Sequence, residues 1–428
     1  MRDDLMPIPS IGELTKGLPP ASPAIDIDDV ARQGWNLLRE DLALPAAVLR
    51  QSALERNEAW MRAFRERTGV LMAPHGKTTM SPQLFQRQLD AGAWAITVAT
   101  VHQMRVCRHF GIRRIVMANQ LIGRQEIDYV LSELRRDPAL EFWCLVDSVR
   151  GVELLEAGLA RIDPGRPLNL LLEGGRPGGR TGCRSLEDAL EVARAVRAGA
   201  PRLALSGVEG FEGLDAAAAD EEIAGFIRYL VRIAEACDRE DLFAAEPVLL
   251  SAGGSAFFDI VTDEFSRADL RRASRIVTRS GCYVAHDSLM YTRAMRRVME
   301  RRPELADLGP PPEAALEVWA YVQSRPEPGK AILTMGKRDV SFDADLPVAL
   351  RWYRPGQEAG PSPVPDGHIV TGLNDQHAHM TVPVESPLRV GDMVGFGISH
   401  PCTTFDKWQM LYLVDDDYTV SGAVTTYF

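Results

Sequence analysis

The sequence predicts an α/β protein made of an N-terminal (β/α)8 TIM-like barrel and a C-terminal mostly-β domain. From residue 69 onward, short apolar runs rich in Val, Ile and Leu alternate with amphipathic segments of helical period. The runs are nearly continuous, as in parallel strands that are buried on both faces. Beyond residue 310 the pattern changes to short alternating runs separated by Gly, Pro, Asn and Asp, which indicates strands and turns.

Eight apolar runs are candidate barrel strands. Eight β-α units over about 220 residues approach the ~250 residues of a typical barrel. An open doubly wound sheet is the alternative, because periodicity does not show whether a sheet closes. The runs are 69–76, 95–100, 114–120, 141–148, 167–175, 203–211, 246–254 and 281–287.

The proline-rich segment 301–313, RRPELADLGPPPE, marks the crossing between two domains. We predict a barrel over residues 45–305, and a β domain formed by residues 1–44 and 306–428. A chain of 428 residues, 46% apolar and 25% charged, has material for two domains.

Composition points to small-molecule chemistry. The net charge of −11 comes without a long basic cluster, which argues against a nucleic-acid partner. The sequence shows no signal peptide and no apolar run long enough to cross a membrane, so we expect a cytoplasmic protein. Its six widely spaced cysteines fit a reducing compartment; they are Cys107, Cys144, Cys183, Cys237, Cys282 and Cys402.

Polar residues gather at the predicted C-terminal ends of the strands, where barrels carry their chemistry. Lys77 follows the first strand within APHGKTTMSP. A lysine becomes a nucleophile at neutral pH only if burial or a neighbouring cation lowers its pKa from about 10.4. A lone rim lysine is more often an ion-pair partner. Other polar residues expected at this rim include His102, Asn119, Asp147, Arg176, Arg180, Glu209, Glu212, His286 and Asp287.

The loop after the seventh strand, SAGGS, is a candidate phosphate cradle. Gly253 and Gly254 let backbone N–H groups turn toward an anion, and Ser251 and Ser255 add hydroxyl donors. A glycine pair also serves in tight turns, so its position after strand seven matters. Together with Lys77, the loop predicts a pyridoxal phosphate site with Lys77 as the Schiff-base lysine.

Two aromatic residues near this rim, Phe211 and Tyr283, are candidates to flank a planar cofactor ring. Aromatic residues at strand ends also pack in cores, so this pair is weaker evidence than the lysine and the glycine loop.

A metal pair is predicted in Ser399-His400-Pro401-Cys402. In an extended strand residues i and i+2 face the same side, so His400 and Cys402 would share one ion. An imidazole with a thiolate favours zinc, and two protein ligands leave positions open for substrate. A buried cysteine beside a hydrogen-bonded histidine is the alternative. His377 and His379 form a second His-x-His pair, for which we favour a substrate or supporting role.

In this order, the motifs resemble those of the fold-type III pyridoxal phosphate enzymes, and more narrowly the D-serine dehydratase and D-threonine aldolase group. The resemblance spans nearly the whole chain, and the first and last segments are the most specific. The matching segments are PHGKTTMSP (74–82), LLEGGRPGGRTG (171–182), SGVEGFEG (206–213), SAGGSAFFD (251–259), GCYVAHD (281–287), GLNDQHAHM (372–380) and SHPCTTFDKW (399–408).

The resemblance implies roles for these residues. Lys77 would form the Schiff base, Arg180 would lie beside the pyridine ring, and Gly253, Gly254 and Ser255 would bind the phosphate. His400 and Cys402 would hold zinc or another divalent metal. Gln376, His377 and Asp406 are candidates for contacting the substrate or supporting the metal ligands. The group acts on D-amino acids as homodimers.

The implied reaction is dehydration of a β-hydroxy D-amino acid to a keto acid and ammonia, which Cys402 and CTTFDKW favour. Retro-aldol cleavage to glycine and an aldehyde is the alternative. Two other classes stay open: a zinc hydrolase barrel without pyridoxal phosphate, which would use His75, His377, His379 and His400, and a non-catalytic pyridoxal phosphate carrier. A carrier of this kind resembles the barrel alone, so the domain beyond residue 310 argues against it.

Overall fold

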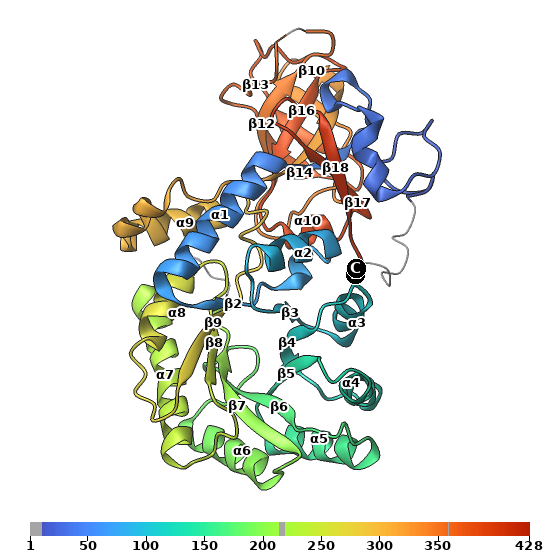
Figure 1. Ribbon diagram of the computed structural model, residues 1–428. Helices are drawn as coiled ribbons and strands as arrows, with labels where there is room; N and C mark the ends of the chain where they lie inside the picture. The colour runs from blue at the N-terminus through green and yellow to red at the C-terminus, as the bar shows by residue number, and fades with distance from the viewer. Residues whose placement is uncertain (1–10, 214–218, 358) are drawn as a thin grey trace.

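The computed structural model describes residues 11–213, 219–357 and 359–428 as two sheets with helices around one of them (Figure 1). Eight parallel strands form the first sheet in the order β2-β9-β8-β7-β6-β5-β4-β3. They are β2 (Leu71–Met72), β3 (Ile96–Val98), β4 (Arg114–Gln120), β5 (Glu141–Val146), β6 (Leu168–Gly174), β7 (Leu203–Gly210), β8 (Val248–Ala252) and β9 (Ser274–Thr278).

The sheet closes between its first two strands. A parallel bridge joins His75 to Thr97, and the Thr97 N–H donates to the Pro74 carbonyl at 2.9 Å. Three residues before Thr97, the Trp94 N–H donates to the Met72 carbonyl at 2.7 Å. The predicted barrel is therefore confirmed, and the open doubly wound alternative is excluded.

Helices follow the strands and cover the outside of the barrel (Figure 1). Their apolar faces form one large core with the outward faces of the strands. These helices are α2 (Pro82–Asp90), α3 (Val101–His109), α4 (Arg124–Arg136), α5 (Val149–Arg161), α6 (Leu186–Ala198), α7 (Asp220–Arg239) and α8 (Phe258–Phe265). Helix α9 (Met290–Arg301) follows β9, and its Met295 and Val298 pack in a different core, with α1 (Gln51–Thr68) and the second sheet.

The eighth strand is displaced from its predicted position at 281–287. It is β9, whose first residues, Ser274 and Arg275, are exposed and give the run a polar start. The apolar segment 281–287 is a buried turn between the two domains. There Val284 and Ala285 pack with residues of the second sheet, and the Ala285 carbonyl accepts from the Ala315 N–H at 2.8 Å.

The second sheet has ten strands, with a central path β13-β12-β16-β10-β1-β17-β18 and β11, β14 and β15 beside it. The elements from β10 to β18 confirm the predicted mostly-β C-terminal domain. The elements are β10 (Leu316–Glu327), β11 (Lys330–Leu333), β12 (Val348–Tyr353), β13 (Ser362–Pro363), β14 (Ile369–Leu373), β15 (Ala378–Thr381), β16 (Met393–Gly397), the short helix α10 (Cys402–Phe405), β17 (Met410–Val414) and β18 (Val420–Thr425).

The N-terminal part of the chain belongs with this second sheet. Strand β1 (Ala46–Arg50) pairs with β10 and β17, although the predicted boundary at residue 45 counts it with the barrel. Helix α1 (Gln51–Thr68) then runs from the second sheet to the barrel (Figure 1). Four short 3-10 helices complete the described elements: η1 (Ile27–Gln33), η2 (Leu37–Arg39), η3 (Gly76–Thr78) and η4 (Pro303–Leu308).

Asn57 on α1 fixes the crossing between the two domains. Its side-chain amide donates to the carbonyls of Val284 and Glu313, at 3.0 and 2.9 Å, and its oxygen accepts from the Glu313 N–H at 2.8 Å. These bonds satisfy buried backbone groups on both sides of the crossing. The segment after β9 is thus held against α1, which matters for the site below.

The sequence also leads us to expect reduced cysteines and no membrane-spanning segment. All six cysteines are free thiols. Within the described parts of the chain, we find no helix that combines the length and apolar content needed for a membrane crossing.

Candidate functional site

Lys77 lies at the C-terminal rim of the barrel, on the 3-10 turn η3 that follows β2. Hydrogen bonds to β9 hold this turn: the Ala73 N–H donates to the Thr278 carbonyl at 2.8 Å, and the His75 N–H donates to the Arg279 carbonyl at 3.2 Å. At Gly76 an added Cβ would lie 3.0 Å from Ile96 and from Phe85. The turn is therefore seated tightly on the barrel, as predicted for the residue after strand one.

The environment of Lys77 favours the neutral amine. By surface area the residue is exposed, because it faces a cavity, but the surrounding protein still displaces much of its hydration. This desolvation lowers the pKa of Lys77, and the charge of Arg180 lowers it further, while a nearby Cys402 thiolate would raise it. Desolvation is the largest of these effects, and the charge of Arg279 acts in the same direction.

The cavity in front of Lys77 has a volume of about 160 Å³. It brings together four of the predicted site residues, Lys77, Arg180, Phe211 and Gly254. Arg180 lies over Phe211, with its Cζ atom 4.8 Å from the ring centroid. The remaining lining residues are His75, Ala99, Ala118, Asn119, Thr181 and Arg279.

In the glycine loop two neighbouring backbone N–H groups converge on one carboxylate. Gly253 has a φ of 89°, and the N–H groups of Gly253 and Gly254 both donate to the Glu212 carboxylate, at 3.2 and 2.5 Å. That carboxylate stands in for an anion such as a phosphate. Burial raises the pKa of Glu212, against the opposing effect of these hydrogen bonds. A cofactor phosphate fits this cradle once the Glu212 side chain moves aside.

The buried Nδ1 atom of His75 also fits a bound group. It has no hydrogen-bond partner within the described residues, although the ring faces the cavity. Burial lowers the pKa of His75 well below its ordinary value, so the ring is neutral at physiological pH. A neutral imidazole beside Lys77 whose Nδ1 atom has no partner leaves a position for a polar atom of a cofactor.

Sequence reasoning missed Arg279, a second arginine of the cavity. It is 6% exposed, pairs with the buried Glu209 carboxylate, and donates to the Gly210 carbonyl at 2.9 Å. Burial raises the pKa of Glu209 to about 8, although the Arg279 charge acts in the opposite direction. Arg279 directly follows β9. Because the eighth strand was predicted too late in the sequence, its rim position was not apparent.

Three other predicted cofactor residues, Ser251, Ser255 and Tyr283, are not among the residues that line the cavity. Ser251 is buried, and its hydroxyl has no hydrogen-bond partner within the described residues. The Ser255 hydroxyl accepts from the Cys282 N–H at 3.3 Å. Tyr283 does not line the cavity and packs in the core shared by α1 and the second sheet.

The predicted metal ligands are not arranged as an extended i, i+2 pair, and this geometric expectation is wrong. His400 has a left-handed φ of 62°, and Cys402 begins the helix α10. The ring atom His400 Nδ1 lies 2.5 Å from a carboxylate oxygen of Asp343. The backbone N–H of His400 donates to the Asp287 carboxylate at 2.9 Å. Among the described residues, no group of three or more His, Cys, Asp or Glu side chains is arranged to hold a metal ion.

Cys402 meets the barrel beside Lys77. Its Sγ atom lies 3.5 Å from the Thr78 hydroxyl and 3.5 Å from Cys282 Sγ. The hydrogen bond between the thiols lowers the pKa of Cys282 and raises that of Cys402. As donors, the Cys402 thiol and the carboxylate-oriented His400 ring suit zinc.

The remaining predicted contact residues lie away from the Lys77 cavity. Gln376 and His377 are exposed on the turn between β14 and β15, and Asp406 is exposed after α10. His379 Nε2 contacts the Asn374 side-chain oxygen at 2.6 Å. The structure therefore does not bring His75, His377, His379 and His400 together as a zinc hydrolase site would require.

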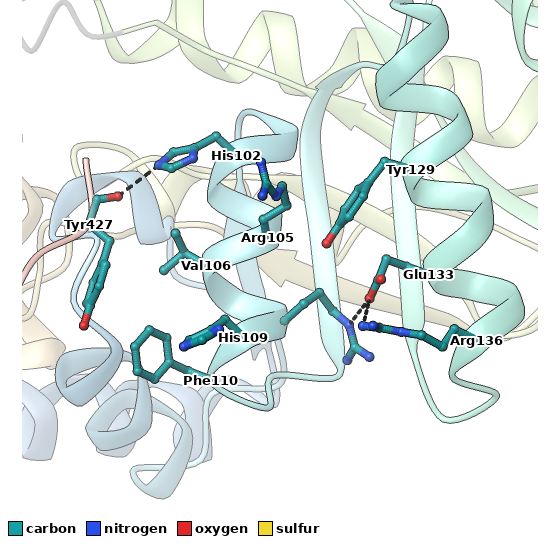
Figure 2. A pocket seen from close by; sticks show the side chains of 10 residues that line it. His102, Arg105, Val106, His109, Phe110, Tyr129, Glu133, Arg136 and Tyr427 are labelled. Atoms are coloured by element: carbon teal, nitrogen blue, oxygen red, sulfur yellow. Dashed lines mark hydrogen bonds and ion pairs between the residues drawn. The ribbon is translucent and has the colours of Figure 1, made fainter. Parts of the chain in front are cut away.

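A second cavity, of about 500 Å³, lies on the outer face of α3 and α4 (Figure 2). His102, expected at the rim, lies there instead, and its Nε2 atom is 3.3 Å from the Tyr427 carbonyl oxygen. The wall across from it carries Glu133, which pairs with Arg108 and Arg136. None of the predicted catalytic, cofactor or metal residues lines this larger cavity.

Sequence comparisons relate the chain to one protein family and to two enzymes. The family described as putative serine dehydratase domain matches residues 315–414. The D-threonine aldolase of Arthrobacter sp. is 26% identical over 392 residues, which cover 90% of this chain and 92% of the relative. The 3-hydroxy-D-aspartate aldolase of Paracoccus denitrificans is 28% identical over 179 residues, 41% of this chain and 45% of the relative.

Solved structures share the fold over both domains. D-threonine aldolase from Filomicrobium marinum superposes with a TM-score of 0.74 at 21% identity, covering 92% of this chain and 97% of that one. D-threo-3-hydroxyaspartate dehydratase from Delftia sp. HT23 gives 0.71 at 23%, covering 92% and 99%. A metal-free structure of a cysteine-to-alanine variant of D-threo-3-hydroxyaspartate dehydratase also superposes on this chain. Its TM-score is 0.71 at 21% identity, covering 92% of this chain and 99% of that one. The alanine racemase of Bacillus anthracis gives 0.59 at 14%, covering 89% and 97%.

These comparisons confirm the predicted resemblance to the fold-type III pyridoxal phosphate enzymes and the alanine racemase-like fold. The expectation of a pyridoxal phosphate-dependent lyase agrees with the activities named for the relatives. The similarity extends through the β domain, which argues against a carrier protein that has the barrel alone.

Proposed function

We propose that the protein is a pyridoxal phosphate- and zinc-dependent lyase that dehydrates a β-hydroxy D-amino acid, as a D-serine dehydratase does. In this proposal the barrel of residues 45–305 carries the cofactor, and the β domain of residues 1–44 and 306–428 carries the metal. The observation behind it is that Cys402 of the β domain lies against the turn that carries Lys77, with 3.5 Å between Cys402 Sγ and the Thr78 hydroxyl.

Lys77 would hold the cofactor and then move the proton at Cα. Bound pyridoxal phosphate would supply the electron sink that makes a Cα proton removable. The lowered pKa of Lys77 supports this role, since only the neutral amine bonds to an aldehyde or accepts a proton. Gly253, Gly254 and Ser255 would bind the phosphate, while Arg180 and Phe211 would border the ring.

The β domain would act on the β-hydroxyl. A zinc ion held by His400 and Cys402 would polarise that hydroxyl and assist its departure. The Asp343 carboxylate, 2.5 Å from His400 Nδ1, would orient the imidazole as carboxylates do for metal-binding histidines. Loss of the hydroxyl gives an enamine that hydrolyses to a keto acid and ammonia.

Retro-aldol cleavage is the second candidate, and the names of both curated relatives favour it. Here a base removes the proton of the β-hydroxyl, the Cα–Cβ bond breaks, and glycine and an aldehyde result. Both reactions need the same lysine and the same polarised hydroxyl. They differ in whether oxygen leaves as hydroxide or stays as a carbonyl.

We place the reaction in the cytoplasm, because six free, widely spaced thiols fit a reducing compartment. We also propose a homodimer. The exposed Gln376, His377 and Asp406, which lie away from the Lys77 cavity of their own chain, would then be free to contact a partner subunit or its substrate.

One assay separates the alternatives. The purified protein is incubated with D-serine, D-threonine and D-threo-3-hydroxyaspartate, with and without a chelator, and keto acid, ammonia and glycine are measured. Dehydration predicts keto acid and ammonia in equal amounts, with activity lost on chelation and restored by zinc. Glycine as the main product would replace dehydration by aldol cleavage. A protein that holds no pyridoxal phosphate after borohydride treatment would refute both.

A further inference from the structure

Cys282 is a buried thiol that the proposed mechanism leaves without a role. It follows β9 in the barrel, whereas Cys402 begins α10 in the β domain, 120 residues later in the chain. Their Sγ atoms nevertheless lie 3.5 Å apart. Cys282 is 5% exposed, so this contact lies inside the protein, between the two domains.

The position of Cys282 is fixed from two sides. A Cβ added to the preceding residue, Gly281, would lie 2.4 Å from the His75 carbonyl oxygen and 2.8 Å from the Thr78 hydroxyl, so the segment passes as close to the Lys77 turn as a glycine allows. The Cys282 N–H donates to the Ser255 hydroxyl at the end of the glycine loop, at 3.3 Å. Cys282 therefore borders both the lysine turn and the phosphate cradle.

The two sulfurs are spaced as ligands of one metal ion. Zinc–sulfur bonds of about 2.3 Å at a tetrahedral angle place two thiolates about 3.8 Å apart, and a disulfide would need about 2.05 Å. The observed 3.5 Å is close to the first value. The Thr78 hydroxyl lies 3.6 Å from Cys282 Sγ and 3.5 Å from Cys402 Sγ, so three polar atoms form a nearly equilateral triangle.

From this geometry we propose that Cys282 is a thiolate ligand of the same metal ion as Cys402. With His400 the donors become two thiolates and one imidazole, a set found in catalytic zinc sites that keep the fourth position for water or substrate. The two sulfurs already lie together, whereas His400 contacts Asp343 and would join them when metal binds. This inference rests on the metal in the proposed function.

A second thiolate changes what the metal does. Two thiolates neutralise the charge of a divalent zinc ion, and soft sulfur donors select zinc over magnesium, calcium or manganese. They also attach the ion to the barrel as well as to the β domain. The metal would then be positioned relative to Lys77 by the segment after β9, which itself bonds to the glycine loop.

Zinc-edge X-ray absorption on the zinc-loaded holoenzyme tests the proposal by counting sulfur neighbours of the metal. A phosphine reductant keeps the thiols reduced without adding a competing thiol. We expect two sulfur atoms per zinc, at about 2.3 Å, in the unmodified protein and one in Cys282→Ala. Zinc affinity should fall at least tenfold in Cys282→Ala. Cys107→Ala, which removes a buried thiol from α3 outside the site, should keep two sulfurs and unchanged affinity.

One sulfur per zinc in the unmodified protein would overturn the assignment of Cys282 and leave the proposed function intact. Two sulfurs retained in Cys282→Ala would also overturn it. A holoenzyme that binds no zinc would overturn the assignment together with the metal part of the proposed function, whereas the bond between the cofactor and Lys77 is tested independently by borohydride. The sulfur count of the unmodified protein decides the question even if Cys282→Ala fails to fold.

Discussion

The proposed cofactor side, around Lys77 and the glycine loop, and the proposed metal side, around His400 and Cys402, are organised differently. On the cofactor side, two adjacent backbone N–H groups of one loop already converge on a carboxylate, and Lys77 sits on a turn held by β9 and β3. On the metal side, the side chains of His400 and Cys402 contact different partners, Asp343 and Cys282. An anion cradle formed by backbone exists as soon as its loop folds, whereas a metal site formed by side chains from separate elements is completed by the ion.

The largest expected effect comes from breaking the cofactor side at Lys77. Lys77→Ala removes both the amine that binds the cofactor and the group that moves the Cα proton, so activity should fall on the order of 10³-fold or more. Borohydride should no longer fix the cofactor to the protein, as mass spectrometry of the intact chain will show. Zinc content should stay at the level of the unmodified protein, because the metal ligands are untouched.

Lys330→Ala on β11 is the matched control for this change. It removes a lysine from the edge of the β domain and should leave activity and borohydride labelling unchanged. Full retention of activity in Lys77→Ala would show that Lys77 neither binds the cofactor nor moves the Cα proton. The proposed cofactor side would then have no basis.

Cys402→Ala is the corresponding break on the metal side, with a smaller expected effect. Loss of a ligand and of the polarised hydroxyl should lower activity about a hundredfold, in keeping with several kcal/mol for metal polarisation. The absorbance of the bound cofactor and its borohydride labelling should persist. Zinc content is measured by atomic absorption, and chelation of the unmodified protein should reproduce the loss. A variant that keeps its zinc and its activity would show that Cys402 holds no metal.

The same division explains what the sequence could predict. The cofactor side lies in contiguous motifs at strand ends, so Lys77, Gly254, Arg180 and Phe211 were predicted and do meet in one cavity. Strand β9 is not recognisable from the sequence because its first residues are exposed and polar. Arg279, which follows it, is therefore not predicted at the rim. A run of apolar residues indicates that a segment is buried, but it does not distinguish a buried strand from a buried turn such as 281–287.

The metal side depends on backbone conformation and distant contacts, which local patterns do not encode. An extended conformation was assumed for His400, but its φ is 62° and a helix begins at Cys402. The contact between Cys282 and Cys402 joins segments 120 residues apart. No spacing rule relates such positions, so only the packing of the two domains reveals the pair.

Glu212→Gln should sharpen the picture of the cofactor side with a moderate effect. The Glu212 carboxylate occupies the N–H groups of Gly253 and Gly254, and its charge opposes a phosphate at the same place. Removing the charge should tighten pyridoxal phosphate binding about three- to tenfold, where tenfold corresponds to about 1.4 kcal/mol. Fluorescence titration of the metal-loaded apoprotein measures this. Glu153→Gln, on the exposed face of α5, is the control; weaker binding in Glu212→Gln would show that the carboxylate supports the cofactor.

The smallest expected effect concerns pH and tests whether the cations of the rim tune Lys77. Capture of pyridoxal phosphate by the apoprotein requires the neutral amine, so its rate rises with pH through the pKa of Lys77, which burial and then the Arg180 charge lower. Arg180→Met removes a cation that disfavours the ammonium form. The pKa therefore rises, and the midpoint of the rate profile moves to higher pH by less than about one unit. Stopped-flow absorbance follows the capture, and Arg180→Lys, which keeps the charge, should leave the midpoint in place. A uniform slowing at every pH in Arg180→Met would instead mean that Arg180 positions the cofactor without tuning the lysine, and the electrostatic advantage of the cofactor side would rest on burial alone.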